Sequence, residues 1–293
     1  MTPAAAITVV IPVWDGYVRW LARAAASLDR QGAAARLVVV DNASAVPVPA
    51  LPRATTVRLR RRVSAGAARN AGLAAVTTPL VCFLDADDDL LPGALARLRA
   101  RMGGAPSCVA AVPAFETVLE DTGEVVELGW PRPAAYRLCR HRRLFALAAA
   151  LRNAYPATGA LIDVAALRAA GGFADADHEE DWLPAVALAA RGRIVLDAAP
   201  GRRYRISDRS LYGAGADLAT MRADRRELRR ALRRDPRTRA MALGFGWALA
   251  AAHFASARVK AAPGRRGHSR LLSAAGAAGH AREGARQDGQ VAA

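Results

Sequence analysis

The sequence predicts an α/β fold with a mostly parallel central sheet flanked by helices. Along the first hundred residues, short runs that are apolar at every position alternate with stretches whose apolar residues recur at helical spacing. Strands that are apolar on both faces are typical of a parallel sheet covered by helices on each side. The length of 293 residues and an apolar fraction of 53% provide enough material for such a core.

The first predicted strand spans residues 7–13, and the helix after it ends near Gly32. The other elements of this half are strands at 37–40, 56–59 and 80–84 and a helix at 65–75. In a parallel sheet the ligand site lies beyond the carboxyl ends of the strands. Asp15, Asp41 and Asp85 follow three of these strands, so we expect them at that edge.

Changes in composition divide the chain into four segments. We expect the first half of one domain at residues 1–103, the second half of the same domain at 104–215, a basic and apolar helical extension at 216–262 and a disordered tail at 263–293. The second half is less regular: it predicts a hairpin at 114–119 and 124–128, helices at 140–152, 165–170 and 181–190, and strands at 158–164, 194–196 and 203–206.

The basic charge is concentrated at the end of the chain. The formal net charge is +16, and from Gly201 onward 20 Arg or Lys face only 7 Asp or Glu. The arginines at 222–239 and the uncharged stretch at 240–257 fit either an interfacial helix on an anionic membrane or a helix packed on the domain. Nucleic acid is disfavoured as a partner, because aromatic residues are not interleaved with the arginines.

The cysteines favour a reducing compartment. Cys82, Cys108 and Cys139 are odd in number and widely spaced, unlike a disulfide framework or a zinc knuckle. The N-terminus has no basic segment before its apolar run, so we expect no secretory signal. These features predict a cytoplasmic protein. If the basic segment is an interfacial helix, the protein would be peripheral at the inner face of the plasma membrane.

The most informative local feature is an acidic run directly after a predicted strand. Asp85, Asp87, Asp88 and Asp89 repel one another unless a cation offsets their charge. Oxygen-only ligands suit Mg²⁺ or Mn²⁺, which keep positions open for phosphate oxygens. The alternative is an acidic turn in which Asp88 or Asp89 caps the helix that follows Pro92.

Two residues on the predicted parallel half could contact a nucleotide. Asp41 could accept hydrogen bonds from a base or ribose, or it could cap a turn. Arg69 lies among small residues at 64–72, which fits either a helix close to a ligand or close packing on the sheet. The chain has no Gly-rich dinucleotide fingerprint at its first strand end, no Walker loop and no nucleophile elbow, so phosphate binding would depend on a metal and arginine.

A second acidic cluster opens a predicted helix. Glu179, Glu180 and Asp181 either favour the helix dipole or supply a general base with a raised pKa beside Trp182. His178 could be a metal ligand or a supporting group, although a lone histidine is more often structural.

Taken together, these motifs resemble glycosyltransferase family 2. Six segments occur in the family's order: Val-Ile-Pro-Val-Trp-Asp at 10–15, Val-Val-Asp-Asn-Ala-Ser at 39–44, Gly-Ala-Ala-Arg-Asn-Ala-Gly at 66–72, Leu-Asp-Ala-Asp-Asp at 84–88, Gly-Gly-Phe at 171–173 and Glu-Asp-Trp at 180–182. The resemblance covers residues 7 to about 206 and implies a GT-A fold, a nucleotide-sugar donor that we expect to be UDP-linked, and transfer to a hydroxyl with inversion.

The resemblance also implies roles for individual residues. Asp41 would read the base, and Pro12, Asp15 and Arg69 would line the nucleotide site. Asp85 and Asp87 would form the DxD pair, with Asp87 the main metal contact and Asp85 toward the ribose. Asp181 would be the catalytic base, supported by Glu180. Trp14-Asp15 stands where Tyr-Asn is more usual, which weakens the assignment of Asp15.

Two other functions stay open at the sequence level. The chain could be an inactive family member that binds an anionic membrane or partner through its basic end, although both acidic clusters are present. A nucleotidyltransferase on a similar sheet is also possible, but the Glu-Asp-Trp segment favours glycosyl transfer. The acceptor, whether glycan, lipid-linked or small molecule, is not indicated.

Overall fold

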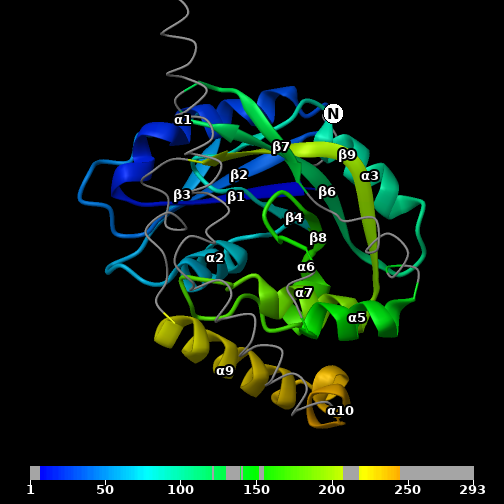
Figure 1. Ribbon diagram of the computed structural model, residues 1–293. Helices are drawn as coiled ribbons and strands as arrows, with labels where there is room; N and C mark the ends of the chain where they lie inside the picture. Colours follow the sequence, from blue (N-terminus) through cyan, green and yellow to red (C-terminus); the bar gives the residue numbers. More distant parts are fainter. Residues whose placement is uncertain are drawn as a thin grey trace, which may run out of the picture.

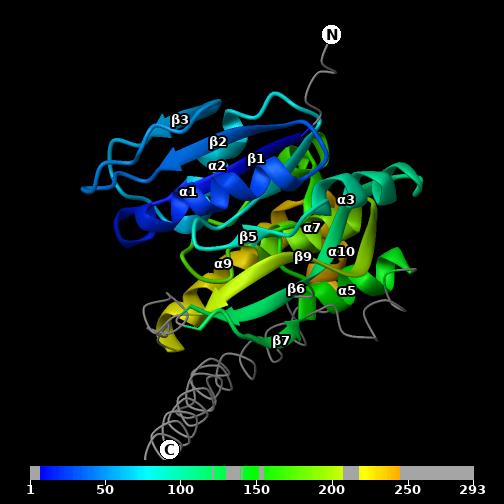
Figure 2. The same cartoon turned by 90° about the horizontal axis from the view of Figure 1, so that it is seen from above.

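The computed structural model describes residues 7–120, 122–129, 139, 141–151, 155–206 and 218–244. Within these residues one sheet of nine strands has the order β3-β2-β1-β4-β8-β6-β9-β5, with β7 paired to β6 (Figures 1 and 2). The strands are β1 (Ile7–Val13), β2 (Ala35–Asp41), β3 (Ala54–Arg58), β4 (Leu80–Phe83), β5 (Asp89–Leu90), β6 (Cys108–Leu119), β7 (Val125–Gly129), β8 (Leu161–Asp163) and β9 (Arg193–Ile206).

Helices cover both faces of this sheet. They are η1 (Asp15–Tyr17), α1 (Val18–Ala26), η2 (Ser27–Arg30), α2 (Ala65–Ala74), α3 (Ala94–Gly103), α5 (Arg142–Leu151), α6 (Val164–Ala169), α7 (Trp182–Arg191), α9 (Leu218–Arg234) and α10 (Pro236–Gly244). Side chains alternate along β1: Val9 and Ile11 pack with α1 and α3, whereas Val10 faces α2, α6 and α7. The strands are therefore apolar throughout because both of their faces are buried.

The longer strand pairings are parallel. β1 pairs in parallel with β2 and β4, β2 with β3, and β6 with β9, whereas β8, β7 and β5 run antiparallel to their neighbours. The predicted α/β class is confirmed, as are most of the predicted elements to within a few residues. The hairpin is present as β6 and β7, although β6 begins earlier than predicted, at Cys108.

Two local predictions are wrong. The strands predicted at 194–196 and 203–206 are one strand, β9, whose pairing with β6 shifts register on either side of Ala114. Asp88 and Asp89 do not cap a helix: α3 starts after Gly93, which has a φ of 71°, and Asp89 opens β5 opposite Arg203 of β9. A glycine suits that left-handed position because it has no Cβ.

The first two helices of the predicted extension pack on the domain. Leu228, Leu232 and Ala242 of α9 and α10 join Trp182 and Val186 of α7 in a third apolar cluster. Figure 1 shows α9 along the lower edge of the molecule, beneath α7. Among the described residues, no helix is both long and apolar enough to cross a bilayer. Residues 245–257 of the uncharged stretch and the tail at 263–293 lie outside the described residues.

Candidate active site

The ends of β1 and β2 bring Asp15 and Asp41 to one edge of the sheet. Asp41 is 2% exposed, and its carboxylate accepts hydrogen bonds from the Ser44 N–H (2.8 Å) and from the Arg58 guanidinium. Asp15, with a φ of 25°, accepts hydrogen bonds from the N–H groups of Ala45 and Val46 at 2.7 and 3.3 Å. In this structure Asp15 therefore holds the loop after β2. Pro12 is the penultimate residue of β1, opposite Val40.

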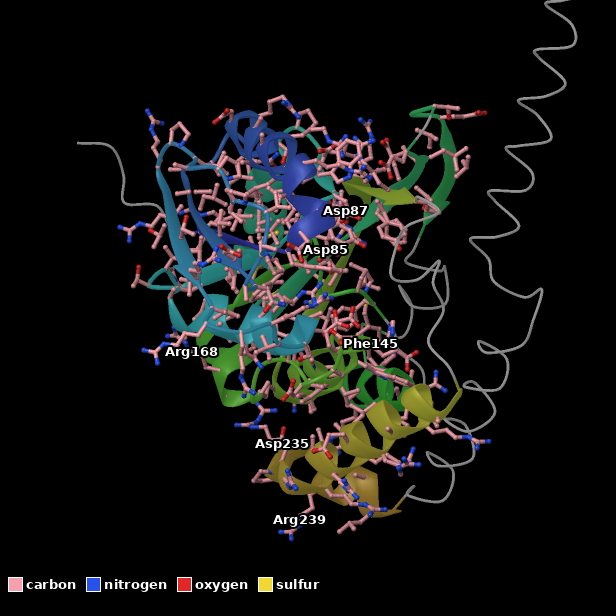
Figure 3. All side chains as sticks on the ribbon, turned by 90° about the vertical axis from the view of Figure 1, so that its left-hand side faces the viewer. Asp85, Asp87, Phe145, Arg168, Asp235 and Arg239 are labelled. Carbon is pink, nitrogen blue, oxygen red and sulfur yellow. The ribbon has the colours of Figure 1, made fainter. Side chains whose placement is uncertain are left out.

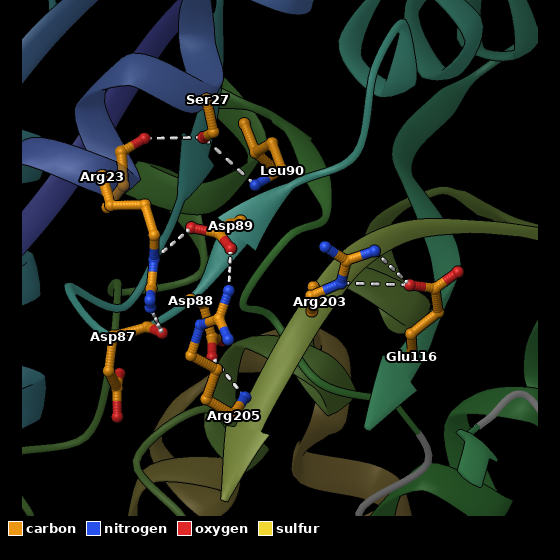
Figure 4. A network of polar contacts seen from close by, with 10 residues as sticks. Arg23, Ser27, Asp87, Asp88, Asp89, Leu90, Glu116, Arg203 and Arg205 are labelled. Atoms are coloured by element: carbon orange, nitrogen blue, oxygen red, sulfur yellow. Dashed lines mark hydrogen bonds and ion pairs between the residues drawn. The ribbon is translucent and has the colours of Figure 1, made fainter. Parts of the chain in front are cut away.

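Arginines from α1 and β9 pair with the last two residues of the acidic run. Asp89 accepts hydrogen bonds from Arg23 Nε (3.0 Å) and from the Arg205 guanidinium, as Figure 4 shows. Asp88 is fully buried and contacts Arg202 Nη1 at 2.8 Å. These pairs balance the charge of two carboxylates and fasten the acidic run to β9.

Asp87 is balanced differently. Among the described residues, no arginine forms an ion pair with its carboxylate, although Arg23 Nη2 donates to its main-chain oxygen at 3.1 Å. Burial raises the pKa of Asp87 to about 7, and the charge of Asp85 adds to this effect. Figure 3 shows Asp85 and Asp87 close to one another in the middle of the molecule. Asp87 is thus the acid in this run that most lacks a cation.

Arg69 of α2 joins the two acidic clusters. Its Nη2 contacts Asp85 Oδ1 and its Nη1 contacts Glu180 Oε1, both at 2.6 Å, and the residue is only 6% exposed. Burial alone would lower the pKa of Arg69, but the carboxylates of Glu180 and Asp85 outweigh it and raise the pKa. The predicted donor residues and the predicted base segment are therefore parts of one site.

Glu180 and Asp181 have different surroundings. Burial raises the pKa of Glu180 to about 7; Arg69 opposes this shift and the charge of Asp181 adds to it. Asp181 is partly exposed, and its Oδ2 accepts a hydrogen bond from the Ala157 N–H at 3.2 Å. Glu180 is thus fixed against Arg69, and the partly exposed Asp181 follows it.

The loop before α7 is fixed to the N-terminal half of α2. The side-chain amide of Asn70 pairs with both main-chain groups of Phe173, each at 2.9 Å. Gly66 lets the backbones approach, because a Cβ there would stand 1.7 Å from the Ala174 carbonyl oxygen. The small residues around Arg69 therefore serve close packing, and this packing is what places Arg69 against Glu180.

The sequence analysis missed the arginines of β9. Arg202 is 5% exposed, contacts Asp88, and lies 4.0 Å from Asp85 Oδ2. Its guanidinium also lies over the rings of Phe115 and Tyr204 at 5.1 and 5.3 Å. The available signal was two arginines within the predicted strand at 203–206 and a third directly before it, which is unusual unless carboxylates lie opposite.

The donor set fits a hard divalent cation. Asp87 forms no ion pair with the described residues and its charge is close to that of Asp85, and carboxylate oxygens suit Mg²⁺ or Mn²⁺. The described residues contain no group of three or more Asp, Glu, His or Cys side chains that could hold a metal, so His178 does not join such a group with them. A metal held by Asp85 and Asp87 would therefore take its remaining ligands from substrate oxygens and water.

The sheet order and helix layers define a GT-A fold, which solved structures share. The fragment 1–349 of S. aureus TarS in complex with UDP-GlcNAc is similar, with a TM-score of 0.64 and 15% identity, over 86% of this chain and 73% of that one. The same fragment in complex with UDP gives a TM-score of 0.55 at 15% identity, over 83% and 72%. At such low identity these likenesses show the fold alone.

The sequence match is more specific. Residues 8–153 match the model of glycosyl transferase family 2, and the chain belongs to this family. The succinoglycan biosynthesis protein ExoO of Rhizobium meliloti (strain 1021) is 31% identical over 110 residues, which is 36% of this chain and 32% of that protein. The match thus spans about a third of the length of this curated relative. The resemblance drawn from the six sequence segments is confirmed at the level of family and fold.

Proposed function

We propose that this chain transfers a sugar from a nucleotide-diphosphate sugar, UDP-linked by preference, to an acceptor hydroxyl with inversion at the anomeric carbon. The observation that carries the proposal is the buried contact of Arg69 with both Asp85 and Glu180. It places a carboxylate pair suited to a donor diphosphate beside a carboxylate pair suited to proton removal. Family membership supports the reaction class, and TarS bound to UDP-GlcNAc supports the choice of donor.

On the donor side, Asp41 reads the base, and Pro12 and Asp15 border the nucleotide. Asp41 is oriented by the Ser44 N–H, and Arg58, whose side chain is 61% exposed, can swing away when a base arrives. Arg69 holds Asp85 toward the ribose. These roles use carboxylates that are already oriented, so donor binding requires little rearrangement of the strands.

Asp87, with Asp85, would hold Mn²⁺ or Mg²⁺. When bound, the ion would supply charge neutralisation for the diphosphate leaving group. Without a cation, burial and Asp85 disfavour the ionised form of Asp87. We therefore expect metal and donor to bind together, and nucleotide diphosphate to bind more tightly with Mn²⁺ than with EDTA.

On the acceptor side, Asp181 is the base. Its carboxylate takes the proton of the acceptor hydroxyl as that oxygen attacks the anomeric carbon from the face opposite the leaving diphosphate, which inverts the configuration. Glu180 stays against Arg69 and fixes the main chain from which Asp181 projects. The Ala157 N–H orients one oxygen of Asp181.

A direct test is a transfer assay. A panel of nucleotide sugars is first screened by thermal shift with Mn²⁺, and the donors that bind are then incubated with hydroxyl acceptors while release of nucleotide diphosphate is measured. We expect metal-dependent turnover with at least one donor. Binding without any turnover or donor hydrolysis would favour a catalytically inactive binding protein.

We also propose that the chain acts in the cytoplasm, peripherally at an anionic membrane surface, through the exposed arginines of α9 and α10. These are Arg226, Arg230, Arg233, Arg234, Arg237 and Arg239. The arginines of α9 repel one another: the pKa of Arg229 is lowered by burial and by the positive charges of Arg233, Arg226 and Arg225. Figure 3 shows Arg239 on these helices well apart from Asp85 and Asp87, so membrane contact would leave the site accessible.

Vesicle flotation tests this association. We expect binding to phosphatidylglycerol-containing vesicles but not to pure phosphatidylcholine, and release by high salt. Replacing Arg226, Arg233 and Arg237 by Gln should reduce flotation. A control with the same loss of charge replaces the exposed residues Arg60, Arg99 and Arg193. Equal loss in both variants would mean a diffuse charge effect and no specific membrane-binding face.

A further inference from the structure

A buried arginine of α9 contacts the segment that carries Glu180 and Asp181. The Nε and Nη2 atoms of Arg225 donate to the two carboxylate oxygens of Glu179 at 2.8 and 3.0 Å, a bidentate pair. Both side chains are nearly inaccessible, at 2% and 5% exposure. The guanidinium also lies 5.5 Å from the ring of Trp182, the first residue of α7.

Glu179 has an unusual backbone conformation. Its φ is 57°, in the left-handed region that disfavours residues with a Cβ. Such a conformation persists only where the surroundings impose it. The carbonyl of Glu179 accepts the Trp182 N–H at 3.0 Å, which closes the turn immediately before α7. Glu180 and Asp181 are the two residues inside this turn.

Consecutive side chains of the turn contact two different helices of the domain. Glu179 reaches Arg225 on α9, whereas Glu180 reaches Arg69 on α2. The turn is therefore held from both sides, with Asp181 next in sequence. A buried ion pair adds little net stability over an apolar pair of similar volume, but it fixes geometry when both partners are fully hydrogen-bonded.

We propose that Arg225 is a positioning residue for the transfer reaction: by holding Glu179 in its left-handed conformation, it sets the direction in which Asp181 meets the acceptor. This inference rests on the proposed function, because it gives the Arg225–Glu179 contact the role of orienting the proposed base, Asp181. It gives the arginine-rich extension a role at the active site that is separate from any membrane contact, because Arg225 is buried and the arginines proposed for the membrane are exposed.

Three variants separate positioning from stability. R225M removes the anchor and with it the bidentate ion pair to Glu179, and the double variant E179Q/R225M also removes the negative charge of Glu179. R225K keeps the positive charge but cannot form the bidentate hydrogen bonds to Glu179. In R225M we expect kcat to fall roughly 10- to 100-fold, the range for a misplaced catalytic group, with the dissociation constant for nucleotide diphosphate and Mn²⁺ changed less than about threefold.

The double variant gives the decisive comparison. If Arg225 positions the turn, E179Q/R225M recovers most of the melting temperature but keeps the low kcat, and R225K is intermediate. If the pair only stabilises the fold, kcat returns together with the melting temperature, which overturns the proposal. Two controls frame the result: R99M changes an exposed arginine of α3, and L232A weakens the packing of α9 without touching the pair. Both should keep kcat within about threefold of the unaltered chain.

Hydrogen exchange provides a readout that does not depend on activity. Amides of residues 177–183 should exchange faster in R225M than in L232A when the two variants are compared at the same interval below their melting temperatures. Exchange that is equal in the two variants would overturn the proposal even if transfer is impaired. If the unaltered chain transfers no sugar from any donor while this exchange difference is present, the proposed function fails but the contact still orders the turn.

Discussion

Arg69 pairs with two carboxylates through one buried guanidinium. The contacts to Asp85 and Glu180 use different nitrogens of the planar fork, so a lysine, with a single ammonium on a flexible stem, could not reproduce them. The sequence predicted Arg69 near the nucleotide but not its contact with Glu180. That contact spans 111 residues and depends on how the loop at 173–178 folds, which local patterns do not encode.

At Asp87, we predict that D87N leaves the chain folded but removes most of the metal dependence of donor binding. Transfer should fall by roughly 100-fold or more, since a bound cation contributes several kcal/mol of charge stabilisation. Calorimetry of nucleotide diphosphate with Mn²⁺ and with EDTA measures the first effect. D29N, at an exposed carboxylate of η2, is the matched control. Metal-dependent binding that survives in D87N would remove Asp87 from the metal site.

At Asp181, we predict that D181N reduces kcat by about 100- to 10,000-fold, the usual contribution of a positioned base, and leaves donor affinity nearly unchanged. Asparagine preserves the volume and can still accept the Ala157 N–H. Steady-state kinetics with varied donor and acceptor distinguish a loss of kcat from a loss of binding. Near-normal turnover in D181N would exclude Asp181 as the base.

Among the elements, α2 depends most on a close backbone approach. The helix begins with Ser64 as N-cap, whose side chain accepts the Ala67 N–H, and Gly66 meets the loop before α7. The sequence predicted the helix because its pattern is local. It did not predict β9 as one strand, because Pro200 and three arginines interrupt the apolar pattern and only the carboxylates opposite explain them.

For α2, we predict that G66A lowers the free energy of unfolding by about 1–3 kcal/mol, because the new methyl group collides with the Ala174 carbonyl. The displaced loop should also reduce transfer, since Glu180 follows it. G103A, at the end of α3, is the control: no atom lies within 4 Å of its added Cβ, so it should be neutral or slightly stabilising. Urea unfolding of both variants measures the difference. If G66A were as stable as G103A, the loop before α7 would be able to move away from the added methyl group without cost.

At the scale of the whole molecule, the described residues make three connected apolar clusters, two on the faces of the sheet and one beneath α5 and α7. The division at residue 103 marks a change in sequence pattern, but the sheet continues across it, since β6 pairs with both β8 and β9. Sequence patterning revealed the two faces of the sheet. It left open whether the arginine-rich helices pack on the domain, and the structure shows that α9 and α10 do.

We therefore predict that α9 unfolds together with the sheet. L232A deletes a fully buried side chain and should cost about 2–5 kcal/mol. If the chain is one cooperative unit, circular dichroism and tryptophan fluorescence should shift together to a single lower midpoint. V10A, in the sheet, provides the comparison, and an early separate transition in L232A alone would mean that α9 and α10 form an independent unit.

The left-handed turn at Glu179 has a consequence for recognising relatives of this chain. Glycine would adopt that backbone conformation with less strain, so a carboxylate is useful there only while an arginine is present to receive it. Positions 179 and 225 should therefore covary: relatives that lack a helix equivalent to α9 should carry Gly or Asn at the first position, and relatives that keep the acid should keep the arginine. An alignment in which the two vary independently would contradict this expectation.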